Sequence, residues 1–381
     1  MIDTQSRERD FPSLKNMTYL NTAAEGIPPR VVGAALEQYA RDKLLGMDGR
    51  AQHFAQLEAA RSLTSELFGL TPTEVAICSC SSEAFNLAAL ALRLVDGDEV
   101  VINDLDYPAG STPWLQPNCP AAVKIWPSRA GALHVADLIP LLGPHTRLVT
   151  TSLVSFFNGF MLSLPPVVEA VRAHSPALLA VDVTQALGRI PLELAGVDLI
   201  VSSTHKWILA SHGGGLVGVP AARATAWTVP AGGWFHLNNQ VPMGPGRLDP
   251  VQSQAGAASF AVGMPNFPAV YAIRAALDYL QGVGVAAIDA AARPLVKACY
   301  AGIKRLPVEM LTPADESVQA GIIAFRHPEM ESIQRKLHAA AIHVMAHAGR
   351  VRIALHGYNT MADVEHLLDT LGAALHDVNA G

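Results

Sequence analysis

The chain has 381 residues, which is enough for two domains or for one large domain with a smaller lobe. Hydrophobic residues make up 50% of the sequence and charged residues 16%, a balance that excludes a disordered chain and fits a well-buried, oligomeric globule. The net charge of -6 comes without any run of like charge, so we expect neither nucleic acid nor a membrane as partner, and a small-molecule substrate is favoured.

Targeting and redox signals favour the cytoplasm. The four cysteines show neither paired CxxC spacing nor a dense framework, so we expect reduced thiols. The first residues, MIDTQSRERDFP, are polar and charged where a secretory signal would need an apolar core. Long uncharged stretches such as 224–246 are interrupted by proline, glycine and asparagine, which argues against a membrane helix. We therefore expect a soluble, cytoplasmic protein.

Short apolar strands alternate with helices through the first half of the chain. A helical pattern that ends at 63–70 leads into a strand at 74–78, and a helix at 81–94 follows, opened by Ser81 and Ser82. A further helix is expected at 165–175, and further strands are expected at 98–103, 146–153, 177–183 and 197–203. This alternation predicts a parallel α/β sheet that is covered by helices on both faces.

The composition changes after residue 206. Between residues 207 and 273 only three positions are charged, so this stretch is expected in the active site or in a subunit contact. Pro268 then begins an amphipathic helix that Gly282 is expected to end, and this helix connects two lobes in our interpretation. Near the C-terminus, Thr360 is the expected N-cap of a last helix.

Three local motifs are disfavoured as functional sites. GGGLVG at 213–218 matches GxGxxG, but it looks like a strand and no acid follows at the spacing that a nicotinamide site requires. His343 and His347 have the i, i+4 spacing of a helical metal pair, yet HxxxH without a glutamate is weak, and we expect no metal. Cys78 and Cys80 would share one face of a strand, where inert packing is the favoured interpretation.

Lys206 stands at the end of the apolar run DLIVSSTHKW, where an ammonium is costly unless it pairs, turns outward or reacts. Asp182 ends an expected strand, and Ser81 and Ser82 open an expected helix. Singly, each fits a structural role, as a surface lysine, a loop cap and a helix cap. Together they suit pyridoxal 5'-phosphate (PLP), which needs a lysine imine, a carboxylate for its ring nitrogen and an anion site for its phosphate.

With these residues in place, the sequence resembles the class V aminotransferase group of fold-type I PLP enzymes. This group includes cysteine desulfurases, selenocysteine lyases, isopenicillin N epimerase and kynureninase. The resemblance runs from YLNTAAEGIPP (19–29) to VRIALHGYNTMADVEHLL (351–368), which is nearly the whole chain. SSTHKW matches the Ser-x-His-Lys signature of the group, which implies that Lys206 is the Schiff-base lysine and that Ser203 and His205 contact the phosphate.

Other motifs carry further cofactor contacts by the same resemblance. VDVTQ resembles the Asp-x-x-Gln motif, which implies Asp182 as the partner of the pyridinium and Gln185 as a contact to the ring hydroxyl. CSSEAFN resembles the phosphate turn and implicates Ser81 and Ser82. Where many relatives stack a histidine on the ring, this sequence offers Tyr107, whose aromatic face can stack equally well.

The resemblance also implies substrate contacts and two departures. VRIALHGYNT resembles the motif whose arginine, here Arg352, holds the substrate α-carboxylate, and Asn21 is a second implied contact. The segment 334–350 lacks the cysteine that desulfurases carry before that arginine, so a persulfide mechanism of the usual kind is not expected. In VGMPN, Met264 cannot supply the hydroxyl that relatives send to the neighbouring subunit's phosphate. The tyrosine and the missing cysteine place the chain nearer the epimerase-like branch.

We therefore expect a fold-type I α/β enzyme. A large PLP-binding domain with a mainly parallel, seven-stranded-type sheet is expected over 15–262, a smaller C-terminal α/β domain over 263–381, and 1–14 as a segment that packs peripherally or on the small domain. The resemblance implies a homodimer with active sites at the interface, in which the freed amine of Lys206 moves the α-proton of an amino acid. A lyase acting on a β-substituted amino acid is favoured, with an aminotransferase and an epimerase as alternatives; the intact catalytic set argues against a non-catalytic binding protein.

Overall fold

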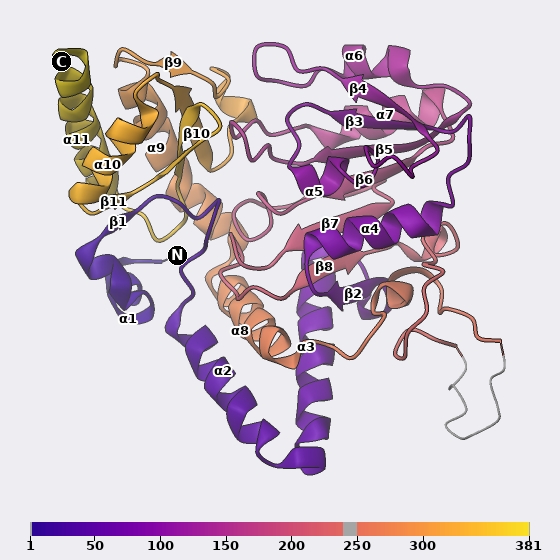
Figure 1. Cartoon of the computed structure of the whole chain (residues 1–381). Coiled ribbons are helices and arrows are strands. Elements are labelled where there is room, and N and C mark those ends of the chain that lie inside the picture. The colour runs from indigo at the N-terminus through magenta and orange to yellow at the C-terminus, as the bar shows by residue number, and fades with distance from the viewer. Residues whose placement is uncertain (1, 239–249, 381) are drawn as a thin grey trace.

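The structure is a computed structural model that describes residues 2–238 and 250–380. A seven-stranded sheet forms the larger lobe, on the right of Figure 1, in the order β2-β8-β7-β6-β5-β3-β4. Neighbouring strands are parallel except for β8, which is antiparallel to both neighbours. The strands are β2 (Val75–Cys78), β3 (Glu99–Asn103), β4 (Ala122–Trp126), β5 (Thr146–Ser152), β6 (Leu178–Asp182), β7 (Leu199–Ser203) and β8 (Gly215–Gly218). This mixed, mostly parallel sheet confirms the expected fold-type I class.

Every strand expected in this lobe is present, and one strand was missed. Apolar runs buried on both faces predict β2, β3, β5, β6 and β7, and these strands lie within a few residues of their expected bounds. β4 was not expected, because it is a sheet edge in which Trp126 is the only buried residue and Lys124 interrupts the apolar run. An edge strand needs less apolar sequence than a central one.

Helices cover the sheet and extend away from it. Those of the larger lobe include α4 (Ser81–Leu92), α5 (Pro108–Ser111), α6 (Val135–Leu138) and α7 (Leu164–His174). Below the sheet in Figure 1, three longer helices pack together: α2 (Arg30–Lys43), α3 (Arg50–Phe68) and α8 (Phe267–Val283). The helix expected at Pro268 is α8, but Gly282 does not end it. The helix continues to Val283 and stops at Gly284, whose φ of 87° leaves the helical region.

The smaller lobe, at the upper left of Figure 1, has an antiparallel sheet in the order β12-β13-β10-β9. Its elements are α9 (Val285–Ile303), β9 (Glu309–Met310), β10 (Ile322–Arg326), α10 (Met330–Ala339), β11 (Ile342–His343), β12 (Met345–His347), β13 (Arg350–Ala354) and α11 (Met361–Ala380). Thr360 caps α11, because its hydroxyl accepts a hydrogen bond from the backbone N–H of Asp363 at 3.2 Å. His343 and His347 lie on two different strands, so the helical spacing considered for a metal pair is wrong.

The N-terminal segment contacts the smaller lobe. β1 (Thr18–Tyr19) pairs in parallel with β11, and Arg7 of α1 (Thr4–Asp10) donates through Nε to the carbonyl of Tyr358 at 2.8 Å. α8, which was placed in the C-terminal domain, packs instead on α2 and α3. The division of the chain at residues 262 and 263 stays a prediction.

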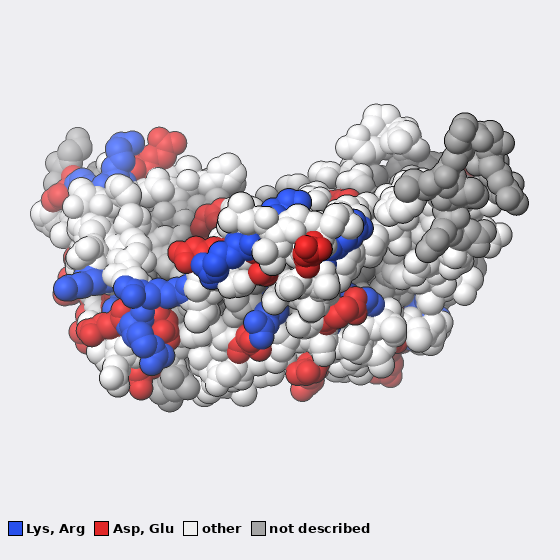
Figure 2. All heavy atoms as spheres, turned by 90° about the horizontal axis from the view of Figure 1, so that it is seen from below, with Lys and Arg blue, Asp and Glu red and all other residues white. Residues whose placement is uncertain are grey.

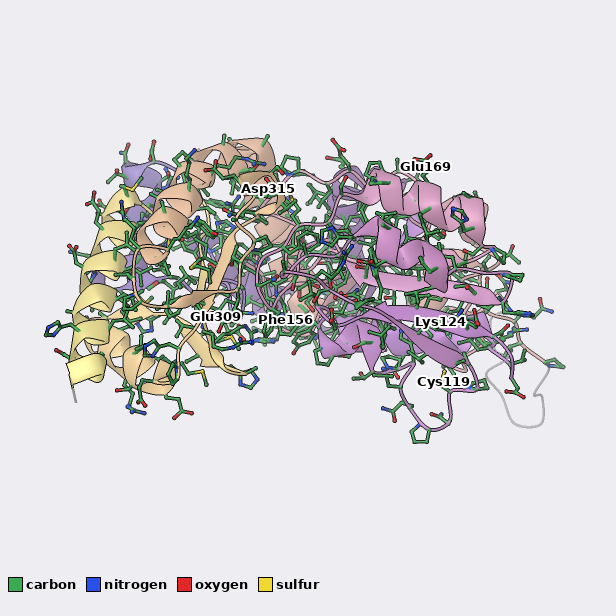
Figure 3. The ribbon with its side chains drawn as sticks, turned by 90° about the horizontal axis from the view of Figure 1, so that it is seen from above. Cys119, Lys124, Phe156, Glu169, Glu309 and Asp315 are labelled. Carbon is green, nitrogen blue, oxygen red and sulfur yellow. The ribbon has the colours of Figure 1, made fainter. Side chains whose placement is uncertain are left out.

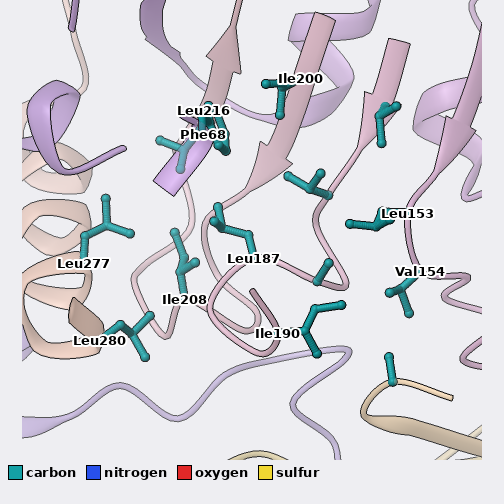
Figure 4. Close-up of a cluster of buried hydrophobic side chains, with 14 of the residues drawn as sticks. Phe68, Leu153, Val154, Leu187, Ile190, Ile200, Ile208, Leu216, Leu277 and Leu280 are labelled. Carbon is teal, nitrogen blue, oxygen red and sulfur yellow. The ribbon is translucent and has the colours of Figure 1, made fainter. Parts of the chain in front are cut away.

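An apolar cluster fixes the loops at the carboxyl edge of the sheet. Leu277 and Leu280 of α8 face Leu187 and Ile208, which belong to the loops after β6 and β7 (Figure 4). These side chains are all essentially inaccessible to solvent, and burying each contributes about 1.5–3 kcal/mol. Because Ile208 is two residues after Lys206, this cluster holds the backbone that carries the lysine.

The sparsely charged stretch from 207 to 273 contributes to the interior of the larger lobe. Trp227, Val229 and Phe260 are buried in a second apolar cluster beside β2 and β8, which is a use that we did not expect. Positions 239–249 lie outside the described residues. Figure 2 shows charges of both signs interspersed on the face seen from below, so no single sign dominates that face. Within the described ranges, no helix is both long and apolar enough to cross a bilayer.

Candidate active site

A cavity of about 560 Å³ opens between the lobes, at the carboxyl edge of the large sheet. Lys206 lies in it, and a smaller hollow that shares Lys206 leads down to Asp182 and Gln185. The predicted residues that line the cavity or this hollow are Ser81, Ser82, Tyr107, Asp182, Gln185, Ser203, His205, Lys206 and Arg352. Asn21 does not line them. It bridges to Ala354, and its Oδ1 is buried with no partner among the described residues.

Lys206 follows β7 and is 9% exposed. Its Nζ lies 4.8 Å from the centroid of the Tyr107 ring. Burial lowers the pKa of Lys206, an effect that Asp182 opposes and the charge of Arg352 adds to. Gly26 packs directly on this turn, where a Cβ would come within 2.0 Å of the Lys206 carbonyl oxygen. The fold therefore holds a poorly solvated amine in a fixed place, which favours its neutral, nucleophilic form.

Hydroxyls and a helix N-terminus converge at one end of the cavity. The Oγ atoms of Ser81, at the start of α4, and Ser203, at the end of β7, are 2.8 Å apart. Gly215 on β8 makes this approach possible, because a Cβ there would lie 2.5 Å from the backbone of Cys80. Two donors next to the first N–H groups of a twelve-residue helix form a site for a phosphate.

His205 borders the same end. Its ring stacks on His212 with centroids 4.1 Å apart, and burial with the nearby charge of Lys206 lowers the pKa of His205 to about 4. Within the described ranges, Glu25, His205 and His212 are also the one trio of possible metal ligands whose ligand atoms lie within 4.8 Å of one another. The two rings are nearly parallel, with an interplanar angle of 17°, and Glu25 already accepts a hydrogen bond from His212 at 2.8 Å.

Asp182 and Gln185 form the floor. One carboxylate oxygen of Asp182 accepts from the backbone N–H of Thr184 at 2.7 Å, and burial raises the pKa of Asp182. A cation beside this carboxylate would offset the cost of its charge. The amide of Gln185 donates to the carbonyl of Ala23 at 3.2 Å and accepts from the indole N–H of Trp207 at 2.5 Å. Its second amide proton has no partner among the described residues and is available to a ligand.

Arg352 reaches the cavity from β13. Its Nη1 donates to the carbonyl of Phe156 at 2.9 Å, and its Nε is buried with no partner among the described residues. Burial, together with the charge of Arg350, lowers the pKa of Arg352 to about 10. Phe156 lies where the two lobes meet (Figure 3), edge-on to Tyr107 with ring centroids 5.0 Å apart. No acid pairs with Arg352 in the described parts of the chain, so its fork is available to a carboxylate.

The sequence missed several residues of the cavity wall. Arg350 is two positions before Arg352 on β13, and strand periodicity would have placed both on one face had the strand been identified. Phe156 and Phe157 carry no motif. Cys80 was expected to pack in a strand beside Cys78, and this is wrong, because Cys80 lies beyond β2 as the N-cap of α4 and is exposed on the cavity wall.

These residues fit PLP. The buried lysine, the buried carboxylate in need of a cation and the hydroxyl-lined helix N-terminus match its aldehyde, ring nitrogen and phosphate in kind. The cavity volume lies within the range of small-molecule sites, about 300–1,000 Å³. Nε of Arg352, which has no partner among the described residues, is available to a substrate carboxylate in the same cavity.

Comparison with known proteins agrees with this geometry. The aminotransferase class-V family matches residues 18–367, so the chain belongs to that family. It is a PLP-dependent, aminotransferase-like enzyme, with PLP as the cofactor expected for the family. The uncharacterized aminotransferase YcbU of Bacillus subtilis (strain 168) is 27% identical over 95% of this chain and 96% of its own length.

Solved structures share the fold. The apo cysteine desulfurase of Thermococcus onnurineus NA1 has a TM-score of 0.88 at 20% identity and covers 99% of both chains. The cystine C-S lyase C-DES, in complex with its product cysteine persulfide, has a TM-score of 0.85 at 23% identity, over 95% of this chain and 99% of its own. A lysine variant of C-DES with glycine linked to PLP has the same score at 24% identity, over 96% and 98%. The chain is thus a class-V PLP-dependent enzyme that shares its fold with a cysteine desulfurase and with a cystine C-S lyase.

Proposed function

We propose that this enzyme is a lyase that eliminates a β-substituent, for example through a C–S bond, from an α-amino acid without a catalytic cysteine. The observation that carries the proposal is the position of the thiols relative to Lys206 and Arg352. Segment 334–350, which precedes the arginine, contains no cysteine. Among the described cavity residues the one cysteine is Cys80, which caps α4 at the opposite, hydroxyl-lined end. A thiol at the phosphate end is poorly placed to attack a substrate side chain.

The residues would divide the work as follows. Arg352 binds the α-carboxylate, and Asp182 holds the proton of the cofactor's ring nitrogen. Ser81, Ser203 and His205 hold the phosphate. When bound, PLP supplies the electron sink that makes the α-proton acidic. Lys206 would hold the cofactor, and its amine would accept that α-proton as general base.

An aminotransferase is the second candidate, because the relative YcbU carries that name and matches nearly the full chain. The same residues serve both reactions, and the outcome depends on whether a leaving group at Cβ departs before a proton returns. An epimerase would return the proton to the opposite face of the same carbon. The three reactions therefore give different products from one cavity.

The test is a panel of β-substituted and ordinary amino acids incubated with the PLP-loaded protein, with products identified by mass spectrometry. We expect a keto acid, ammonia and the released substituent. Transfer of the amino group to a second molecule would instead establish an aminotransferase. Inversion of the α-carbon would establish an epimerase. In parallel, borohydride reduction followed by peptide mapping should find the cofactor on Lys206, and a cofactor fixed to another lysine would overturn the assignment of the site.

We also propose a cytoplasmic homodimer with active sites at the interface. The turn between α2 and α3 leaves Leu44, Leu45 and Met47 87%, 54% and 72% exposed, an apolar surface that a second copy would cover. The four free cysteines suit a reducing compartment. Light scattering coupled to size exclusion should give twice the chain mass of 40.3 kDa, and a monomer at working concentration would refute the dimer.

A further inference from the structure

Arg350 is a second buried arginine in the wall of the Lys206 cavity. It stands two residues before Arg352 on β13, so both side chains project from the same face of the strand. Its side chain is almost fully enclosed, at 1% exposure for the residue. In the ranges that the structure describes, no carboxylate forms an ion pair with it. The cavity wall therefore carries two neighbouring guanidinium groups without a counter-charge.

The contacts of Arg350 leave one end of the guanidinium unused. Nε donates to the carbonyl of Phe157 at 2.8 Å, Nη1 donates to the carbonyl of His347 at 3.1 Å, and the guanidinium carbon lies 4.2 Å from the centroid of the Phe157 ring. Nη2 is buried and has no partner among the described residues. Burial lowers the pKa of Arg350 to about 10, and no acid offsets that effect. Carbonyls and a ring face orient the group, but they do not neutralise it.

Arg189 shows how the same fold treats a buried arginine whose role is structural. It is also fully enclosed, yet its Nη1 lies 2.9 Å from a carboxylate oxygen of Asp289. Removing a charge from water without a partner costs several kcal/mol, so an unpaired buried guanidinium is expected to receive its anion from outside the chain. Arg350, which faces a cavity, is placed to do so.

Arg350 and Arg352 stand at different distances from the turn between β12 and β13, because Arg350 pairs with His347 next to the turn and Arg352 pairs with Met345, two residues further along. Arg352 donates to the carbonyl of Phe156, whose ring lies edge-on to Tyr107, and the Tyr107 ring centroid lies 4.8 Å from Nζ of Lys206. Arg350 instead contacts His347 beside the turn between β12 and β13, where Ala348 and Gly349 both have positive φ. An amino acid whose α-carboxylate sits on Arg352 would extend its side chain along this wall toward Arg350.

We infer that the substrate is an α-amino acid with a second anionic group on its side chain, such as a carboxylate or a sulfinate, which Arg350 binds. This inference rests on the proposed function, because it takes Arg352 as the site of the α-carboxylate. A guanidinium fork suits both kinds of anion. Arg350 is thus a specificity-determining residue for the side chain.

The test compares binding of matched amino acids to the PLP-loaded enzyme, followed by the change in the visible absorption of the cofactor. Aspartate is paired with asparagine and glutamate with glutamine, so that only the charge of the side chain differs. Cysteine sulfinate compared with aspartate then distinguishes a sulfinate from a carboxylate. We expect each acid to bind about tenfold to a hundredfold more tightly than its amide. Equal affinities of acid and amide in both pairs would overturn the inference.

Variants test whether Arg350 causes the tighter binding of amino acids with an anionic side chain. Arg350→Met should bring the affinity for each acid down to that for its amide and leave the amides nearly unchanged, whereas Arg350→Lys should retain part of the preference. Arg335→Met, which removes an exposed arginine of α10, is the control and should keep the full preference. If Arg350→Met weakens the binding of acid and amide alike, the arginine only stabilises the wall of the cavity, and the inference fails.

Two safeguards keep this result separate from the proposed function. Peptide mapping after borohydride reduction reports whether the cofactor is on Lys206 whatever the side-chain preference turns out to be. A cofactor on Lys206 without a preference for anions would remove this inference alone. Should Arg350→Met fail to fold, the acid and amide pairs with the wild type and with Arg350→Lys still decide.

Discussion

Asp182 is a residue whose surroundings set its chemistry. It is buried at the end of β6, burial raises its pKa, and a pyridinium proton would stabilise the ionised form. Asp182→Asn keeps the shape and the hydrogen bond from Thr184 but removes the negative charge. We expect the variant to bind PLP and to lose activity by roughly 10² or more, because an unprotonated ring is a weak electron sink. The measurement is kcat/KM at matched cofactor occupancy.

Asp104→Asn is the matched control, since Asp104 is exposed and its only described hydrogen bond, from the backbone of Ser128 at 3.0 Å, can be kept by an asparagine. It should retain wild-type activity. Near-normal turnover in Asp182→Asn would end the role assigned to that carboxylate.

The four cysteines allow a second prediction. Cys78 and Cys299 are buried, which raises the pKa of both thiols, that of Cys299 to about 12, and Cys119 is half-buried beside another surface hollow. Only Cys80 borders the Lys206 cavity within the described residues. Replacing all four by alanine or serine should leave turnover within about tenfold, apart from packing losses of roughly 1 kcal/mol per buried site.

Single variants identify an exception if there is one. Cys119→Ser, far from the cavity, serves as the control for handling and stability. Loss of turnover in Cys80→Ser with an intact cofactor spectrum would show that a thiol nucleophile takes part, and the lyase without a cysteine would then be abandoned.

The site could be predicted from the sequence where its residues stand in local motifs. Lys206, Asp182 and Ser81 each follow or end an element whose pattern is clear, and the parallel sheet brings such positions to one edge. Arg350 could not be singled out, because only the three-dimensional structure shows that none of the described carboxylates pairs with it. Asn21, placed by resemblance, lies outside the cavity wall, and its role stays a prediction.

Among the loops, the one over residues 155–161 links the two lobes. Gly159 in it has a φ of 79°, and a Cβ there would meet the carbonyl oxygen of Ile322 on β10 at 2.1 Å. Gly159→Ala should therefore lower the free energy of unfolding by about 1–3 kcal/mol. It should also weaken substrate binding, because Phe156 and Phe157 precede it and both line the cavity. Chemical denaturation and substrate titration measure the two effects.

Gly282→Ala is a control of opposite sign. Gly282 is exposed within α8, and apart from its chain neighbours and the backbone of its own helix no described atom lies within 4 Å of the place that a Cβ would take. Alanine there should stabilise the protein by about 0.4–1 kcal/mol. Equal effects of the two substitutions would show that the 155–161 loop does not hold the lobes in the described contact.

The elements followed from sequence wherever burial on both faces left an unbroken apolar run. Short elements did not. β11 and β12 span two and three residues, too few for a period to show, so His343 and His347 gave a false helical spacing. The end of α8 was misplaced by two residues, because which glycine breaks a helix depends on its φ.

For the whole molecule, the alternating pattern and the family resemblance together predicted the fold class, and the seven-stranded sheet confirms it. The pairing of β1 with β11 was beyond reach, since two residues at one end of the chain pair with two residues more than three hundred positions away. Such a contact leaves no local pattern. How the lobes hold together therefore has to be argued from the structure.

His356 lies where the two lobes meet, and it makes the stability of their contact depend on pH. It is fully buried, stacks on Trp207 and Tyr358, and one ring nitrogen lies 3.1 Å from the carbonyl of Trp207. Burial and the charge of Arg189 lower its pKa to about 3. The unfolded chain binds a proton here near pH 6.5 and the folded protein does not, so the stability that the neutral histidine contributes is present above pH 6.5 and is lost as the pH falls toward 3.

Buried acids oppose this trend. Burial raises the pKa of Asp106 to about 7, so its neutral form favours the folded state below that pH, and this stability is lost as the pH rises through 7. Between pH 6.5 and 4, His356 and Asp106 therefore make the free energy of unfolding change with pH in opposite directions. The pH dependence of the wild type therefore hides the contribution of His356, and a difference between variants is needed to reveal it.

We expect His356→Gln to be less stable than the wild type at pH 7, because the stacking contacts of the histidine are lost. On acidification, however, the free energy of unfolding of the variant should fall less than that of the wild type. Each pH unit between 6 and 4 should narrow the gap in the free energy of unfolding by about 1.4 kcal/mol, the value of one proton per pH unit. Asp106→Asn should show the opposite effect. From pH 6 to 4 its free energy of unfolding should fall more steeply than that of the wild type, by about 1.4 kcal/mol per pH unit. The measurement is urea denaturation of the cofactor-free protein at several pH values, with the exposed His376→Gln as a control that should run parallel to the wild type. A gap between His356→Gln and the wild type that stays constant from pH 6 to 4 would show that His356 is protonated in the folded protein, and acid would then not act on the lobe junction through this residue.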